Sequence, residues 1–136
     1  MAASRPDGPQ ADDAQALPAT PLPPCRYPTN CVRRSRAFEA DADRLFESAE
    51  RAVRQTGGFT IGKMESIRPD PSARRFESTF RLFGFKDDLV AAVEPHAGGA
   101  VLHVRSASRT GRGDLGVNRR RVRAFFERVE DALQSG

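Results

Sequence analysis

The stretch LVAAVEPHAGGAVLHVRSAS, residues 89–108, decides the fold. On both sides of PHAGG, residues 95–99, apolar side chains recur at every second position, as in strands that bury one face. Proline and glycine make PHAGG a turn, and so short a connection joins antiparallel neighbours, because parallel strands need a long crossover. Leu89, Ala91 and Val93 therefore mark one strand, and residues 100–108 form the strand beside it.

Two further strands are predicted upstream of this hairpin. Residues 74–85 alternate, with Phe76, Phe80 and Leu82 on one face and polar side chains on the other. Residues 59–67 also have the composition of a strand, which Pro69 and the proline after it would end. Short connections between all four segments favour an antiparallel meander.

Amphipathic helices are predicted on either side of the four strands. Residues 41–55 carry apolar side chains at helical spacing and end before Gly57 and Gly58. After the loop GRGDLG, residues 111–116, Asn118 is a plausible N-cap for a closing helix. The apolar stripe of that helix consists of Val122, Phe125, Phe126, Val129, Ala132 and Leu133. The sequence thus predicts an α+β fold in which two helices flank a four-stranded antiparallel β-sheet, in the order α-β-β-β-β-α.

The N-terminal region differs in composition from this domain. Seven of the ten prolines lie between Pro6 and Pro28, with no apolar periodicity, so we expect residues 1–33 to form a disordered or extended tail. Residues 34–136 then form a single domain of common size. No apolar stretch is long enough to cross a bilayer, and no secretory signal is evident, so we expect a cytoplasmic protein.

Both cysteines, Cys25 and Cys31, occur in the short motif CRYPTNC. Without an export signal we expect reduced thiols, although the spacing also allows a disulfide. A metal site is poorly supported, because two thiolates need two more ligands and both histidines are remote in sequence.

Three stretches resemble one known family. FGFKDDLVAAVEP, VRSASRTGRGDLGVNRRRV and, more loosely, PTNCVRRSRAFE are similar to the signature of the Domain of Unknown Function 1499 family. In the last stretch Arg33 and Arg34 replace the serines of the family pattern, and Thr29 separates the proline from Asn30. The resemblance covers about residues 25–133 and implies no reaction, because the biochemistry of the family is unassigned.

Positive charge is concentrated in one segment. Seven arginines and one aspartate lie between Arg105 and Arg123, although the whole chain has a net charge of only +4. Several of these arginines fall at the start of the closing helix, where the helix dipole disfavours cations. We therefore expect a bound anion or nearby carboxylates to offset them.

Hairpin geometry gathers the candidate site residues. A turn centred near Ala97 places Asp87 opposite about Ala107 and Asp88 opposite about Ser106, within about two residues. Guanidinium groups, glycine-rich turns and free helix N–H groups are the ingredients of a phosphate or carboxylate site. The predicted ligand-binding residues are Arg105, Ser106, Ser108, Arg109, Asp114, Asn118 and Arg121, with Asp87 and Asp88 in a structural or ligand-supporting role.

The resulting hypothesis is a non-catalytic binding or structural module with an arginine-lined corner for a small anion or phosphate-bearing ligand. One alternative is a hydrolase-like enzyme using Asp87, Asp88 or Asp114, but adjacent aspartates on a strand point to opposite faces. Another is a weak nucleic-acid or anionic-lipid binder; nucleic acid is disfavoured because the phenylalanines fall mostly on apolar faces. The sequence indicates no catalytic residue, metal, cofactor or protein partner.

Overall fold

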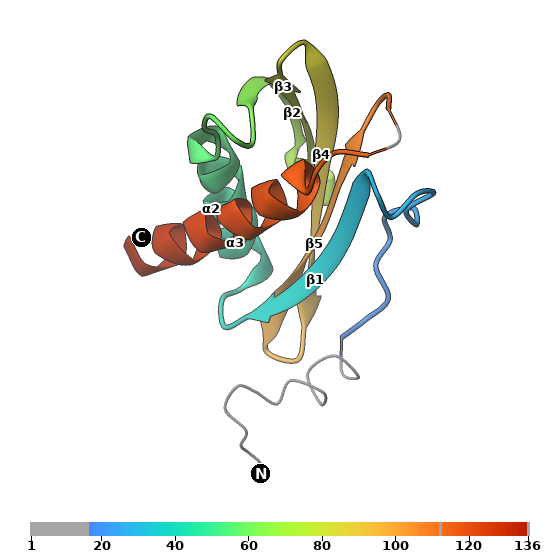
Figure 1. Ribbon diagram of the computed structural model, residues 1–136. Helices are drawn as coiled ribbons and strands as arrows, with labels where there is room; N and C mark the ends of the chain where they lie inside the picture. The colour runs from blue at the N-terminus through green and yellow to red at the C-terminus, as the bar shows by residue number, and fades with distance from the viewer. Residues whose placement is uncertain (1–16, 112, 136) are drawn as a thin grey trace, which may run out of the picture.

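The computed structural model describes residues 17–111 and 113–135. Its elements follow in the order β1 (Cys31–Phe38), α2 (Ala42–Gln55), β2 (Lys63–Asp70), the 3-10 turn η1 (Pro71–Ala73), β3 (Arg75–Leu82), β4 (Phe85–His96), β5 (Gly99–Ser108) and α3 (Val117–Ser135) (Figure 1). The prediction of an α+β fold with two helices and an antiparallel sheet is confirmed. No helix in the described ranges is long and apolar enough to cross a membrane.

The sheet has five strands, not the four predicted, in the order β1-β5-β4-β3-β2 with every pair antiparallel. The missed strand is β1, which pairs with β5 along its whole length, from Cys31 opposite Ala107 to Phe38 opposite Ala100. Its sequence CVRRSRAF lacks an apolar alternation because an edge strand leaves both faces partly exposed. β1 also begins before residue 34, where we placed the start of the domain.

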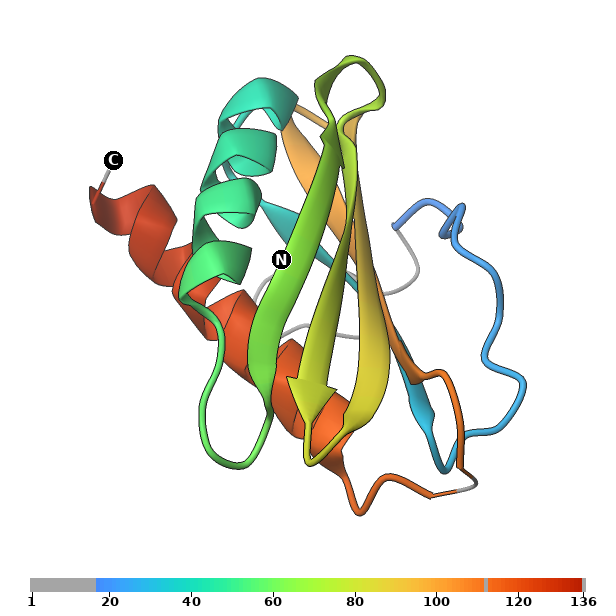
Figure 2. The same cartoon turned by 90° about the horizontal axis from the view of Figure 1, so that it is seen from above.

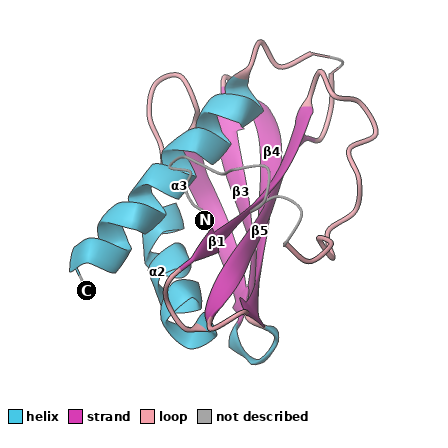
Figure 3. Cartoon of the chain, turned by 90° about the horizontal axis from the view of Figure 1, so that it is seen from below, coloured by secondary structure: helices cyan, strands magenta, loops and turns pink. Residues whose placement is uncertain are grey.

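Both helices pack against one face of the sheet, so the molecule has two layers (Figures 1 and 3). Phe76 and Phe80 of β3 and Leu89 of β4 meet Phe125 of α3 in the core between the layers. The first helix begins at Ala42, and a side-chain oxygen of Asp41 caps it by accepting a hydrogen bond of 2.8 Å from the backbone N–H of Arg44. β2 starts at Lys63 instead of residue 59, so Phe59 lies in the loop after α2.

Residues 17–30 lie on the other side of the sheet, the outer face (Figure 2). Arg105 of β5 donates to the backbone oxygens of Pro23 and Pro24, at 3.0 and 3.4 Å, and Arg33 of β1 donates to that of Leu22 at 2.9 Å. The side chain of Leu22 is buried. This part of the predicted tail therefore contacts the domain, whereas residues 1–16 lie outside the described residues.

The expectation of reduced thiols was wrong, because Cys25 and Cys31 form a disulfide. The chain between them turns back on itself where Asn30 donates to the carbonyl of Tyr27, at 3.2 Å. This turn brings the two Cα atoms to 5.6 Å, within the range that a disulfide needs. The disulfide joins the segment on the outer face to the first residue of β1.

Candidate functional site

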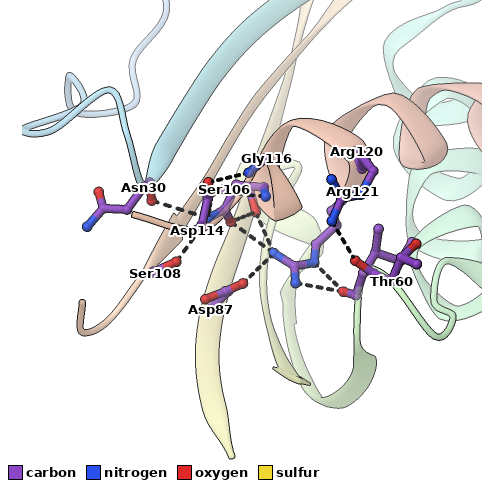
Figure 4. Close-up of polar contacts among 11 residues, drawn as sticks. Asn30, Thr60, Asp87, Ser106, Ser108, Asp114, Gly116, Arg120 and Arg121 are labelled. Atoms are coloured by element: carbon purple, nitrogen blue, oxygen red, sulfur yellow. Dashed lines mark hydrogen bonds and ion pairs between the residues drawn. The ribbon is translucent and has the colours of Figure 1, made fainter. Parts of the chain in front are cut away.

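A buried arginine organises one end of the fold. Arg121, in the first turns of α3, is fully buried, and its guanidinium lies 4.8 Å from the ring centre of Phe80. It pairs with Asp87 at 2.8 Å and donates two hydrogen bonds, of 3.0 and 2.6 Å, to the carbonyl of Ile61 (Figure 4). Arg121 thereby joins β4 to the loop between α2 and β2. The anion that we expected beside it is the protein's own Asp87.

Asn118 connects Arg121 to β5. Its side-chain oxygen accepts from Ser106 at 2.6 Å and from Arg121 at 2.9 Å. Its amide nitrogen lies 3.0 Å from the hydroxyl of Ser108, 2.7 Å from a carboxylate oxygen of Asp114 and 3.2 Å from the backbone oxygen of Asn30. We call this set the polar corner: Asp87, Ser106, Ser108, Asp114, Asn118 and Arg121.

The N-cap assignment was wrong, because Asn118 lies inside α3 and points into the protein. Asp114 satisfies the free N–H groups at this helix start, accepting from the backbone of Gly116 at 2.8 Å and of Asn118 at 3.1 Å (Figure 4). Glycine at position 116 lets the chain turn with a φ of 81° between the carboxylate and the helix. The helix dipole is thus offset by a carboxylate of the chain itself.

The pKa shifts reflect this arrangement. Burial acts to raise the pKa of Asp114, but hydrogen bonds from Asn118 and from the N–H of Gly116 outweigh it and lower the pKa. Burial lowers the pKa of the Arg121 guanidinium, and the nearby charge of Asp87 partly opposes that effect. The polar corner therefore holds charged groups whose partners are already inside the protein.

Two predicted ligand-binding residues lie elsewhere. Arg109 binds both carboxylate oxygens of Asp88, at 2.9 and 3.0 Å, and that carboxylate also accepts from Thr79 at 3.0 Å. Arg105 is held by the carbonyls of Pro23 and Pro24. Asp88 and Arg105 are on the outer face because side chains alternate along a strand, and Asp87 and Ser106 occupy the inner face. The β4–β5 register pairs Asp87 with Ser108, one residue away from the predicted pairing. The structure thus separates Asp88, Arg105 and Arg109 from the polar corner.

Another hydrogen-bonded chain crosses the outer face. The hydroxyl of Ser35 lies 2.6 Å from Nδ1 of His103, whose Nε2 lies 2.6 Å from a carboxylate oxygen of Glu94. The order resembles that of a serine hydrolase triad. However, only 1% of His103 is exposed, and other residues line the cavities described below. We interpret this chain as cross-strand bonding that satisfies a buried imidazole.

A cavity of about 450 Å³ adjoins the polar corner. Asp87, Ser108 and Asp114 belong to both the cavity wall and the corner, and Arg120 lies beside them in the wall. Four exposed side chains around the cavity are large and apolar, and we call them the apolar rim: Phe59 (85% exposed), Phe83 (77%), Phe85 (62%) and Leu115 (93%). A larger hollow of about 740 Å³, near the β4–β5 turn, has no such exposed apolar side chain in its lining.

Most phenylalanines pack in or against the core, as expected, but the three of the apolar rim do not. Phe83 and Phe85 flank Gly84 in the β3–β4 turn, Phe59 follows Gly57 and Gly58, and Leu115 lies in the glycine-rich loop before α3. Apolar residues beside glycines in turns were the available signal, and we had assigned Phe59 and the β3–β4 residues to strands. Sequence reasoning missed the rim, and the predicted ligand-binding residues did not include Arg120.

Three loops bring the apolar rim together at the end of the molecule where α3 begins (Figure 2). The rings of Phe59 and Phe83 meet edge to face, with centroids 6.4 Å apart. Arg120 joins two of the loops, donating to the carbonyl of Leu115 at 3.0 Å and to that of Thr60 at 3.2 Å. Among the described residues, its Nε is the one buried side-chain nitrogen or oxygen that has no hydrogen-bond partner.

Residues suited to metal binding do not cluster in the described ranges: no group of three or more histidine, cysteine, aspartate or glutamate side chains lies together there. Asp87 and Asp114, the two carboxylates that line the cavity, are held instead by Arg121 and by the N–H groups at the start of α3. The wall therefore offers hydrogen-bonding groups and one incompletely paired guanidinium, that of Arg120.

Solved structures with a similar fold come from several sources. TTHA0849 from Thermus thermophilus matches with a TM-score of 0.54 and 12% identity, over 77% of this chain and 97% of that one. DynU16, a putative protein in the dynemicin biosynthetic locus, gives 0.57 and 17%, over 80% and 49%. StfQ, a di-domain ARO/CYC from the steffimycin biosynthetic pathway, gives 0.54 and 14%, over 74% and 44%.

These likenesses show the fold alone, because the identities are low. The chain spans about half the length of the last two proteins. No curated protein sequence matches the chain significantly. A family model described as "Protein of unknown function (DUF1499)" matches residues 4–129, which confirms the resemblance seen in the sequence: the chain belongs to the DUF1499 family.

Proposed function

We propose that this protein is a binding module for a small amphipathic molecule, whose apolar part lies against the apolar rim and whose anionic or polar group faces Arg120. The observation that carries the proposal is the grouping of four of the five exposed large apolar side chains in the described part of the chain around one cavity. Scattered exposed apolar residues are ordinary, but a contiguous group around a hollow is typical of a binding site.

The cavity size supports this function. Ligand pockets commonly measure about 300–1,000 Å³ and combine apolar walls with a few placed polar groups. This cavity, at about 450 Å³, falls in that range, and its polar groups include Arg120 and three residues of the polar corner. Structures of similar fold include ARO/CYC proteins, which fits a small-molecule site without identifying a ligand.

Arg120 is the arginine best placed to receive an anionic group. Arg121, Arg105 and Arg109 are bound to Asp87, to the carbonyls of Pro23 and Pro24, and to Asp88. Arg120 bonds only to neutral carbonyls, and its buried Nε has no acceptor among the described residues. The cavity wall therefore contains a guanidinium charge that no carboxylate among the described residues neutralises, and an anionic ligand group would neutralise it. We therefore propose Arg120, rather than Arg105, Arg109 or Arg121, as the arginine that binds an anionic group.

The hydrolase alternative has weaker support. Asp87 is neutralised by Arg121, Asp114 is engaged by three hydrogen bonds at the start of α3, and Asp88 lies on the outer face. A general acid or base needs a proton that it can exchange with a substrate. Each of these carboxylates is instead bound to other groups of the protein and so is poorly placed to exchange a proton with a substrate.

The proposal can be tested with a matched pair of fluorescent probes, 1-anilinonaphthalene-8-sulfonate and its neutral analogue N-phenyl-1-naphthylamine. Both should bind the wild-type protein, because both present aromatic rings to the apolar rim. Arg120→Gln should weaken sulfonate binding by about tenfold or more, since a charge-assisted hydrogen bond is lost, and leave the neutral probe unchanged. Arg123→Gln, an exposed arginine on the same helix, is the control.

Val117→Trp adds a second arm, because Val117 lines the cavity and a larger side chain would fill it. Both probes should then bind more weakly, while thermal unfolding remains cooperative. The proposal fails if neither probe binds the wild-type protein. It also fails if Val117→Trp leaves both affinities unchanged, because the probes would then be binding elsewhere.

A further inference from the structure

Two residues of the apolar rim have a backbone conformation that their side chains disfavour. Phe83 and Leu115 have φ angles of 52° and 54°, a region normally taken by glycine or asparagine. Their side chains are 77% and 93% exposed, so they gain little burial inside the fold in return. Unfavourable backbone combined with exposed apolar surface indicates a use outside the folded chain.

These side chains stand on projecting loops. Phe83 lies in the tight β3–β4 turn, Leu115 in the loop before α3, and Phe59 in the loop after α2, all at the same end of the molecule (Figure 2). Apolar side chains that project together from neighbouring loops suit shallow insertion into a soft apolar layer, such as the boundary between lipid headgroups and acyl chains.

The unpaired charge at this end is positive. Among the described residues, Arg119, Arg123 and Lys63 are exposed and have no ion pair. Arg119 follows the Leu115 loop at the start of α3, and Lys63 begins β2 just after the Phe59 loop. Three of the nearby acids are already paired with cations: Asp87 with Arg121, Asp88 with Arg109, and Glu65 with Arg81 and Lys86. The fourth, Asp114, has no ion pair among the described residues, but its carboxylate accepts hydrogen bonds from the N–H groups at the start of α3.

We propose that this end of the molecule docks peripherally on an anionic lipid surface. Phe59, Phe83 and Leu115 enter the boundary between headgroups and acyl chains, and the unpaired cations meet lipid phosphates and carboxylates. Charge complementarity selects this partner, because anionic membranes attract clustered lysine and arginine next to inserted apolar side chains. The inference goes beyond the proposed function, since docking needs the tips and the cations but not an open cavity.

The experiment is vesicle co-sedimentation of the full chain, with phosphatidylcholine–phosphatidylserine vesicles compared with phosphatidylcholine alone. The main variant is Phe83→Asn combined with Leu115→Asn, because asparagine tolerates positive φ and so removes the apolar tips without straining the fold. Ala97→Asn is the matched control, since Ala97 has a φ of 48° in the β4–β5 turn at the other end of the sheet.

We expect the wild-type protein and Ala97→Asn to bind the anionic vesicles, and the double variant to bind at least about tenfold more weakly. Arg119→Gln with Arg123→Gln should weaken binding by roughly fivefold per residue, and added salt should do the same. Val117→Trp should still bind vesicles, so loss of probe binding in the cavity and loss of docking are separate results.

Absence of wild-type binding to anionic vesicles overturns the proposal. Equal binding to both vesicle types removes the role of the cations, and undiminished binding of the double asparagine variant removes the role of the tips; either result overturns it. Sedimentation equilibrium provides a further check without lipid. A wild-type dimer that the double asparagine variant dissociates would assign the tips to contact between copies of this chain instead.

Discussion

Asp87 and Asp88 are neighbours in β4, but the ion pairs that they form lie in opposite surroundings, one buried and one exposed. Asp87 faces the helices and pairs with Arg121 at 2.8 Å, where 7% of the aspartate side chain and none of the arginine side chain is exposed. Asp88 faces outward and pairs with Arg109 at 2.9 Å, where 38% and 48% are exposed. The residue types and distances are nearly the same, so the difference between the pairs is their access to water.

That difference determines what each pair contributes. An ion pair exposed to water adds little to stability, since solvent can replace either partner. A buried pair contributes modestly as a whole, but removing one partner leaves a charge that water cannot reach. The inner pair is also part of the polar corner, whereas Thr79 is the further partner of the outer pair.

Loss of Arg121 should have the largest effect. Arg121→Met leaves Asp87 buried without its cation and the carbonyl of Ile61 without its two donors. We expect the free energy of unfolding to fall by about 3–5 kcal/mol, measured by urea denaturation. Arg123→Met, two residues along the same helix but exposed, should change it by less than about 0.5 kcal/mol.

A double-mutant cycle separates the pair from the other contacts of Arg121. Asp87→Asn combined with Arg121→Met should be less destabilising than the sum of the single variants, because neither charge is then left alone. Strict additivity in this cycle would show that Asp87 and Arg121 do not stabilise each other.

Asp114 should have an intermediate effect that depends on pH. Asp114→Ala removes the acceptor for two backbone N–H groups at the start of α3, which should cost about 1–2 kcal/mol near neutral pH. Because the folded pKa of Asp114 is lowered, its stabilisation is complete above the unfolded pKa and is lost as the pH falls through the folded pKa. The stabilities of the wild-type protein and the variant should therefore begin to converge as the pH falls below about 4, the unfolded pKa, and converge fully only below the lower folded pKa. A constant difference across that range would mean that the charge of Asp114 does not contribute.

The sequence predicted both helices and the central hairpin, because their apolar periodicity is strong. It did not predict β1, because the three arginines of this edge strand interrupt the alternation of apolar and polar residues. The β4–β5 register was one residue off, within the expected error, so the residues opposite Asp87 and Asp88 could not be fixed from the pattern. The face could have been predicted, because Asp87 alternates with Leu89, Ala91 and Val93, which pack toward the helices.

The candidate site was likewise predicted only in part from the sequence. Five of the seven predicted ligand-binding residues meet in the polar corner, because hairpin register and chain order bring them to one end of the sheet. Their role depends on partners distant in sequence, such as Ile61 and Asn30, which no local pattern reveals. The apolar rim was missed because binary patterning assigns phenylalanine to the core, whereas turn geometry places Phe83 in solvent.

The outer pair should have the smallest effect, and salt offers the sharpest contrast with the inner pair. Burial acts to raise the pKa of Asp88, but hydrogen bonds from Arg109 and Thr79 outweigh it and lower the pKa, so Asp88 is charged at neutral pH. Asp88→Asn and Arg109→Gln should each leave the melting temperature almost unchanged, because water solvates the remaining partner. Any small difference should disappear in 1 M NaCl, where the Debye length is about 3 Å. The destabilisation caused by Arg121→Met should persist there, because ions do not reach a buried carboxylate. If salt instead abolished the Arg121 effect and spared that of Asp88, the assignment of the two faces would be reversed.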